Sequence, residues 1–134
     1  MKEDIDFPEV KGVTIAITKE TKDESDFWTV HLLNDNKCTL ENVLINSVGY
    51  GKNKDGKEQK TSRLRHMFEE VPPQTAPVVE PLDPHLIHLT NQYWVSYYIG
   101  TKIFDKRFIF VPETIIEENM IYIPLLEKEG ILHD

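Results

Sequence analysis

The sequence predicts an all-β protein in which two antiparallel sheets pack face to face. About seven short segments alternate apolar and polar residues with a period of two, which is typical of strands with one buried face. Turn-forming residues separate these segments at intervals of about 8 to 12 residues. Almost no stretch has long helical periodicity. We therefore expect a two-layer β-sandwich and not a fold that alternates strands with helices.

The first three segments have the most regular alternation. Residues 13–18 and 26–34 each place one apolar row on one face of a strand. These rows are Val13, Ile15 and Ile17, followed by Trp28, Val30 and Leu32. The third segment, residues 39–50, is partly apolar on both faces, so we expect it in the middle of a sheet.

A polar hairpin and an edge strand follow. Residues 51–57 are polar and contain Asp-Gly, a pair suited to a tight reversal. The next predicted strand covers residues 59–71. Residues 76–82 contain Pro77 and Pro81, and proline lacks a donor for the strand ladder, so we place this strand at a sheet edge.

A short helical turn is expected at residues 83–89, because Asp83 can cap it and Pro84 suits its first position. Residues 92–99 and 102–111 are rich in aromatic and β-branched side chains and predict a hairpin. In its second strand one face is largely aromatic and is the candidate core face, formed by Phe104, Lys106, Phe108 and Phe110.

The C-terminal segment, residues 112–134, carries a net charge of -5 but is too apolar for a disordered end. We divide the chain into a sandwich domain, residues 1–111, and this C-terminal arm. The arm is expected to pack on the same domain, to pair with a second copy, or to form the last strand of the sandwich.

Two stretches resemble immunoglobulin-like and fibronectin-type sandwiches. In residues 28–48, Leu33-Asn34 ends one strand and Leu40-Glu41-Asn42-Val43 begins the next, which resembles the second and third strands of those folds. Residues 68–82, with the corner Val71-Pro72-Pro73, resemble their passage from the fourth to the fifth strand. The resemblance spans about residues 10–112 and implies architecture alone, since the cysteine pair of antibody domains is missing and the tryptophan lies on a different strand. The chain also looks like small uncharacterised bacterial proteins.

The overall charge argues against two classes of partner. The 134 residues include 23 acidic and 15 basic side chains, for a net charge of -8, which repels nucleic acid and anionic membranes. Cys38 is the single cysteine, so no internal disulfide can form. We expect a cytoplasmic protein, because the N-terminal residues lack a signal-peptide pattern and no apolar run is long enough to span a membrane.

Catalytic and metal-binding patterns are weak. No Gly-x-Ser-x-Gly motif occurs and Cys38 has no reactive setting, so we expect neither enzymatic activity nor a cofactor. His85 and His88, three residues apart, and Asp83 are weak candidates for a metal site that lacks a fourth ligand. An enzyme completed by these residues across a dimer interface is a remaining alternative.

The clearest charge asymmetry lies in residues 52–65. This segment contains six basic and two acidic residues, which gives a local net charge of +4. This segment is either a docking surface for an acidic partner or a solvated hairpin whose lysines keep an edge soluble. The candidate contact residues are Lys52, Lys54, Lys57, Arg63 and Arg65, together with Tyr122 in the arm.

Four aromatic residues form two rows on one strand, with Tyr93 and Tyr97 on one face and Trp94 and Tyr98 on the other. An exposed row could bind a carbohydrate or another small ligand, whereas packing in the core or at a subunit interface is the alternative. We predict a non-catalytic sandwich that acts in protein–protein association, as a homodimer. A carbohydrate or small-ligand module on the aromatic strand is the second hypothesis.

Overall fold

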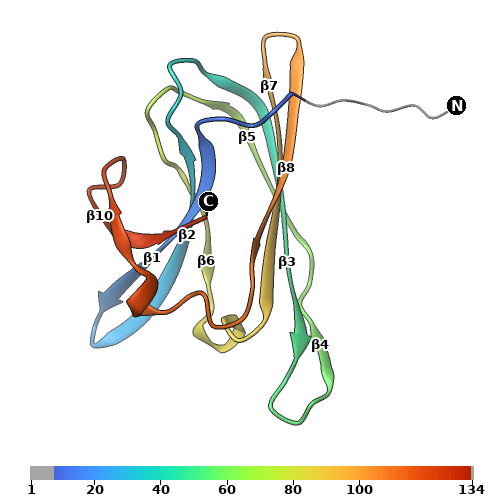
Figure 1. The fold of residues 1–134 in the computed structure, drawn as a ribbon, viewed down its shortest axis with the longest axis vertical. Coiled ribbons are helices and arrows are strands. Elements are labelled where there is room, and N and C mark those ends of the chain that lie inside the picture. Colours follow the sequence, from blue (N-terminus) through green and yellow to red (C-terminus); the bar gives the residue numbers. More distant parts are fainter. Residues whose placement is uncertain (1–7, 134) are drawn as a thin grey trace, which may run out of the picture.

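Two antiparallel sheets face each other in the computed structural model, which describes residues 8–133 (Figure 1). The strand order is β6-β2-β1-β10-β9 in the first sheet and β4-β3-β7-β8 in the second, where β5 also pairs with β3. All pairings are antiparallel. The prediction of an all-β, two-layer fold is confirmed.

The strands fall close to the predicted segments. The first sheet consists of β1 Val13–Lys22, β2 Ser25–Asn34, β6 Val78–Leu82, β9 Ile121–Ile123 and β10 Lys128–Leu132. The second consists of β3 Leu40–Lys52, β4 Glu58–Lys60, β5 Leu64–Val71, β7 Thr90–Ile99 and β8 Lys102–Phe110. Two short 3-10 turns, η1 Pro84–Leu86 and η2 Glu117–Asn119, complete these elements.

One predicted strand is interrupted by a bulge. Residues 59–71 were expected to be continuous, but β4 and β5 are separate strands that pair with the same edge of β3. Thr61 remains attached to β3, because its backbone amide donates to the Gly49 carbonyl and its hydroxyl accepts from the Gly49 amide, at 2.8 and 2.7 Å. Between the two paired stretches, two residues of β3 face three of the partner, which is the arrangement of a β-bulge.

The predictions for residues 76–89 are confirmed. Strand β6 lies at the edge of the first sheet, where the missing donor of Pro81 is tolerated. The Asp83 carboxylate accepts a hydrogen bond of 2.9 Å from the His85 amide and caps η1, and Pro84 occupies the first turn.

The core lies between the sheets and contains the predicted faces. Tyr93 and Tyr97 of β7 point inward, as do Phe108 and Phe110 of β8, and all four are at most 2% exposed. The Tyr97 ring stacks on Phe104 with 5.1 Å between the ring centroids. Strand β3 is central, as its two partly apolar faces predicted.

The C-terminal arm completes the first sheet of its own chain. Strand β10 pairs with β1, and β9 pairs with β10 (Figure 1). Ile115 and Ile131 are buried in the main core, while Ile123 packs in a second apolar cluster with Ala16 and Leu33. The arm therefore covers apolar surface at both faces of the first sheet.

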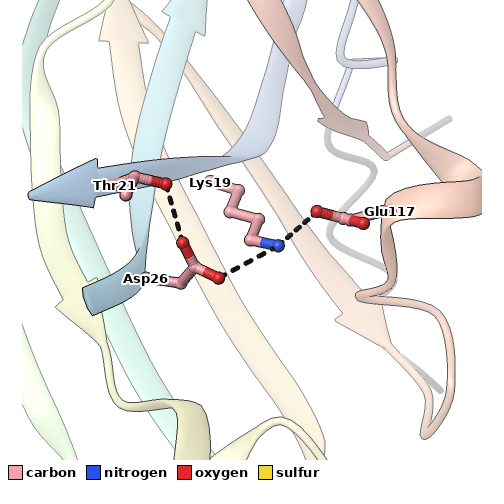
Figure 2. A network of polar contacts seen from close by, with 4 residues as sticks. All are labelled: Lys19, Thr21, Asp26 and Glu117. Carbon is pink, nitrogen blue, oxygen red and sulfur yellow. Dashed lines mark hydrogen bonds and ion pairs between the residues drawn. The ribbon is translucent and has the colours of Figure 1, made fainter. Parts of the chain in front are cut away.

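Ion pairs attach the arm to the β1–β2 hairpin. Figure 2 shows the Lys19 ammonium between the carboxylates of Asp26 and Glu117, with Thr21 donating to Asp26 at 2.7 Å. The hydrogen bond from Thr21, followed by that from Lys19, lowers the pKa of Asp26. Because Lys19 and Asp26 belong to the hairpin and Glu117 to η2, the network joins the arm to it.

His31 is buried in the first sheet, and its Nε2 atom lies 3.0 Å from the Thr18 hydroxyl. Burial holds the pKa of His31 below its ordinary value of 6.5, while the nearby charges of Lys128 and Glu20 act in opposite directions. Below about pH 6.5 the unfolded chain therefore binds a proton that the folded chain does not take up.

We expect the free energy of unfolding to fall as the pH drops from about 6.5 toward the folded-state pKa of His31, because only the unfolded chain gains the proton. The slope is at most about 1.4 kcal/mol per pH unit, the limit for one proton. In urea unfolding measured across this range, His31→Gln should flatten the pH dependence of the free energy of unfolding. A His31→Gln curve parallel to that of the unmodified protein would contradict this account.

Candidate functional site

The β3–β4 hairpin projects beyond the end of the sandwich (Figure 1). Asn53 organises its turn, because its side-chain oxygen accepts hydrogen bonds from the amides of Asp55 and Lys57, at 2.9 and 3.0 Å. Gly56 has a φ of +78°, which glycine adopts without strain. Lys52, Lys54 and Lys57, the predicted contact residues, are exposed on this hairpin. The turn chemistry therefore presents the lysines on a defined loop.

A depression of about 470 Å³ separates the hairpin from η1. Its lining consists of Lys52, Asn53, Lys54, Pro84, His85 and His88. The fold thus brings together two sets of residues that are about 30 positions apart and that the sequence suggested for different roles. Lys52 and Lys54 are the charged side chains of this lining, so the surface is suited to anions.

Each histidine makes one exposed side-chain hydrogen bond at the depression. His88 Nε2 lies 3.1 Å from the Gln59 side-chain oxygen, and His85 Nδ1 lies 3.1 Å from the Asp83 carboxylate. The His85 backbone amide, followed by the His85 side chain, lowers the pKa of Asp83. Within residues 8–133, no group of three or more His, Cys, Asp or Glu side chains is placed to hold a metal ion. Asp83, His85 and His88 consequently do not converge on one metal position.

The remaining predicted contact residues lie apart from this depression. Arg63 is exposed in the bulge after β4, and Arg65 is exposed on β5 opposite Asn46 of β3. Tyr122 is 60% exposed on β9, which is the outermost strand of the other sheet. The structure therefore does not unite Tyr122 with the basic residues in one surface.

The four aromatic residues of β7 do not form one ligand face. Tyr93 and Tyr97 are each 1% exposed, and burial raises the pKa of Tyr97 to about 12. Trp94 is on the outer face, where its indole N–H donates to Asp105 at 2.7 Å and the Arg107 guanidinium lies 4.5 Å from its ring. Tyr98 is also on this outer side, so the two predicted rows are separated by the sheet itself.

A second concave site lies between the edges of the two sheets, and Pro84 of η1 lines both this site and the depression beside the hairpin. We call it the inter-sheet cleft; its volume is about 460 Å³. The lining is largely apolar, with polar groups from β3, β6 and β7, and comprises Phe27, Ser47, Val48, Gly49, Thr61, Ser62, Leu64, Glu80, Pro81, Leu82, Asp83, Pro84, Leu86, Asn91 and Tyr93.

Glu80 is the central charged residue of the inter-sheet cleft and is only 9% exposed. Its Oε1 atom accepts a hydrogen bond of 2.8 Å from the Ser47 hydroxyl and one of 2.6 Å from His66 Nε2. Burial, followed by the negative charge of Glu80, raises the pKa of Tyr93 well above its usual range. A buried carboxylate is thus held between both sheets, since Glu80 belongs to β6 and its two partners to β3 and β5.

The Ser47–Glu80–His66 arrangement differs from a nucleophilic triad. In a triad the histidine contacts the serine hydroxyl and takes its proton, while the carboxylate orients the histidine. Here the serine and the histidine both bond to the carboxylate, so the Ser47 hydroxyl is oriented toward Glu80 and not toward a base. The arrangement is therefore not that of an acyl-transfer triad.

Sequence reasoning missed this polar group. A usable signal was present, because Glu80 and Leu82 lie two residues apart in a strand and therefore share one face. A carboxylate beside a buried leucine in an otherwise apolar segment indicates a buried charge that needs partners. Its partners are distant in sequence, and only the fold identifies Ser47 and His66.

No helix in the described residues is long and apolar enough to cross a membrane. Comparison of the chain with protein-family models, with curated proteins and with solved structures gave no match.

Proposed function

We propose that this chain is a non-catalytic, immunoglobulin-like β-sandwich that acts in protein–protein association and docks an acidic partner on its basic hairpin. The supporting observation is the depression between the hairpin and η1, where Lys52 and Lys54 face His85 and His88. In a chain with a net charge of -8, this local positive field steers an acidic surface to one place.

Shape adds to the charge argument. If the lysines served only to keep an edge strand soluble, no residues from another part of the fold would have to lie opposite them. Here the opposite wall comes from a separate part of the fold, where His88 Nε2 lies 3.1 Å from the Gln59 side-chain oxygen of β4. A concave surface built from two separate segments is better suited to recognition than a flat solvated hairpin.

Charge reversal tests this proposal. We expect Lys52→Glu, Lys54→Glu and Lys57→Glu together to weaken binding of a short polyglutamate peptide by about tenfold or more, because attraction becomes repulsion. Fluorescence anisotropy at several salt concentrations measures the affinity, which should also fall with salt in the unmodified protein.

The matched control reverses Lys11, Lys22 and Lys102, which are exposed elsewhere and change the net charge by the same amount. This control should bind within about threefold of the unmodified protein if the site, and not the total charge, decides. Equal loss in both triple variants, or no loss in the hairpin variant, would refute the docking site.

We further propose that the protein self-associates as a homodimer in the cytoplasm, where the exposed Cys38 thiol stays reduced. Supporting this is β9, an edge strand on which Ile121 and Tyr122 are 51% and 60% exposed. Edge strands with apolar side chains readily pair with a second copy.

Sedimentation velocity tests the dimer. We expect the unmodified chain to sediment as a dimer and Tyr122→Lys as a monomer, because a charge at the paired edge opposes association. Tyr98→Lys places the same charge on the other sheet and should remain dimeric. A monomeric unmodified chain, or a dimeric Tyr122→Lys variant, would exclude this interface.

A further inference from the structure

We propose that the inter-sheet cleft binds a small molecule that joins a cationic amine to an apolar body. This site is separate from the basic hairpin, and its chemistry is the opposite, since the central charge is the Glu80 carboxylate. A carboxylate this deeply buried selects a positively charged group and excludes an anion.

The cleft retains acceptors that the fold does not use. Both hydrogen bonds of Glu80 within residues 8–133 end on Oε1, so Oε2 stays available to a donor. The Tyr93 hydroxyl also makes no hydrogen bond within these residues and borders the same space. An ammonium group has three donors and can therefore use Oε2 and the Tyr93 oxygen together.

Ser47 and His66 position the carboxylate. They bond to the same oxygen from two strands of the second sheet, which fixes the side chain of Glu80 from the first. A positioned acceptor loses little conformational entropy when a ligand binds. The two residues thus position Glu80 for a ligand, and Ser47 also lines the cleft.

The walls suit an apolar body. Phe27, Leu64, Leu82 and Leu86 line the cleft, and its volume of about 460 Å³ lies in the range of small-molecule sites. Leu64 is 48% exposed and lies where the bulge opens the sheet edge. Arg63 and Arg65 on that edge are solvent-exposed, so water and salt screen their repulsion of a cation.

The probes are phenethylamine, its neutral analogue phenethyl alcohol and its anionic analogue hydrocinnamate, each titrated against labelled protein by amide NMR. We expect phenethylamine to shift the amides of Ser47, Gly49 and Thr61 in a saturable way. The alcohol should bind about tenfold more weakly, because it forms no charge-assisted hydrogen bond, and the anion should leave these amides unchanged. Equal affinity for amine and alcohol, or no saturable shift at the cleft, overturns the proposal.

Glu80→Gln should weaken phenethylamine binding about tenfold, whereas Glu69→Gln, at an exposed carboxylate on β5, should have no effect. Leu64→Lys gives a second test that does not depend on removing a buried charge. Its ammonium group at the mouth of the cleft competes for Glu80, so the amine should again bind about tenfold more weakly. Unchanged affinity in a folded Glu80→Gln or in Leu64→Lys would refute the assignment.

Discussion

A chain that ends at Val111 is expected to lose its cooperative unfolding transition. Removing residues 112–134 takes away β10, the neighbour of β1, and exposes the surface that Ile115, Ile123 and Ile131 cover. Each of these isoleucines is at most 3% exposed, and burying such a side chain stabilises a protein by about 1.5–3 kcal/mol. Together they approach the whole free energy of unfolding of a typical domain, about 5–15 kcal/mol.

Circular dichroism and urea unfolding measure this loss. Ile131→Ala serves as a milder companion, with an expected cost of about 2–5 kcal/mol and a retained fold. A truncated chain that stays soluble and unfolds cooperatively, with nearly the stability of the full chain, would show that the arm is an accessory segment and not part of the sandwich.

Phe108→Ala is expected to lower the free energy of unfolding by about 3–5 kcal/mol. The Phe108 ring is fully buried between the sheets, and it contacts the His133 ring edge-on at 5.2 Å between centroids. Removing it leaves a cavity that the surrounding β-sheet backbone cannot readily close. The same variant also weakens a contact between β8 and the end of the arm.

The adjacent residue supplies the control. Ile109 points to the outer face of β8 and is 39% exposed, so Ile109→Ala should cost about 1 kcal/mol or less. Urea unfolding of both variants provides the comparison, and the free energy of unfolding should depend equally steeply on urea concentration in both. Similar losses for the two substitutions would contradict the assignment of inner and outer faces on this strand.

Local patterns predicted most of the fold. Alternation alone identified the inner faces of β1, β2 and β8, because a strand turns successive side chains to opposite sides. The cap at η1 was predicted from Asp83, and the edge position of β6 from Pro77 and Pro81. These features depend on neighbours in sequence and can therefore be predicted from it.

Long-range pairing could not be predicted in this way. The contact between β1 and β10 joins residues more than 100 positions apart, and the sequence left the place of the arm open. The bulge at Thr61 depends on a bond to Gly49 across the sheet. Glu80 meets Ser47 and His66 only after both sheets have packed, so no local pattern placed the inter-sheet cleft.

The most direct test of the docking proposal is an amide NMR titration of the labelled chain with the polyglutamate peptide. The account predicts saturable shifts confined to the hairpin around Lys52 and Lys54 and to the facing turn at His85 and His88, and it predicts their disappearance in the triple lysine-to-glutamate variant. Shifts that centre on another surface, or that persist in that variant, would contradict the claim that the basic hairpin is where this sandwich receives its partner.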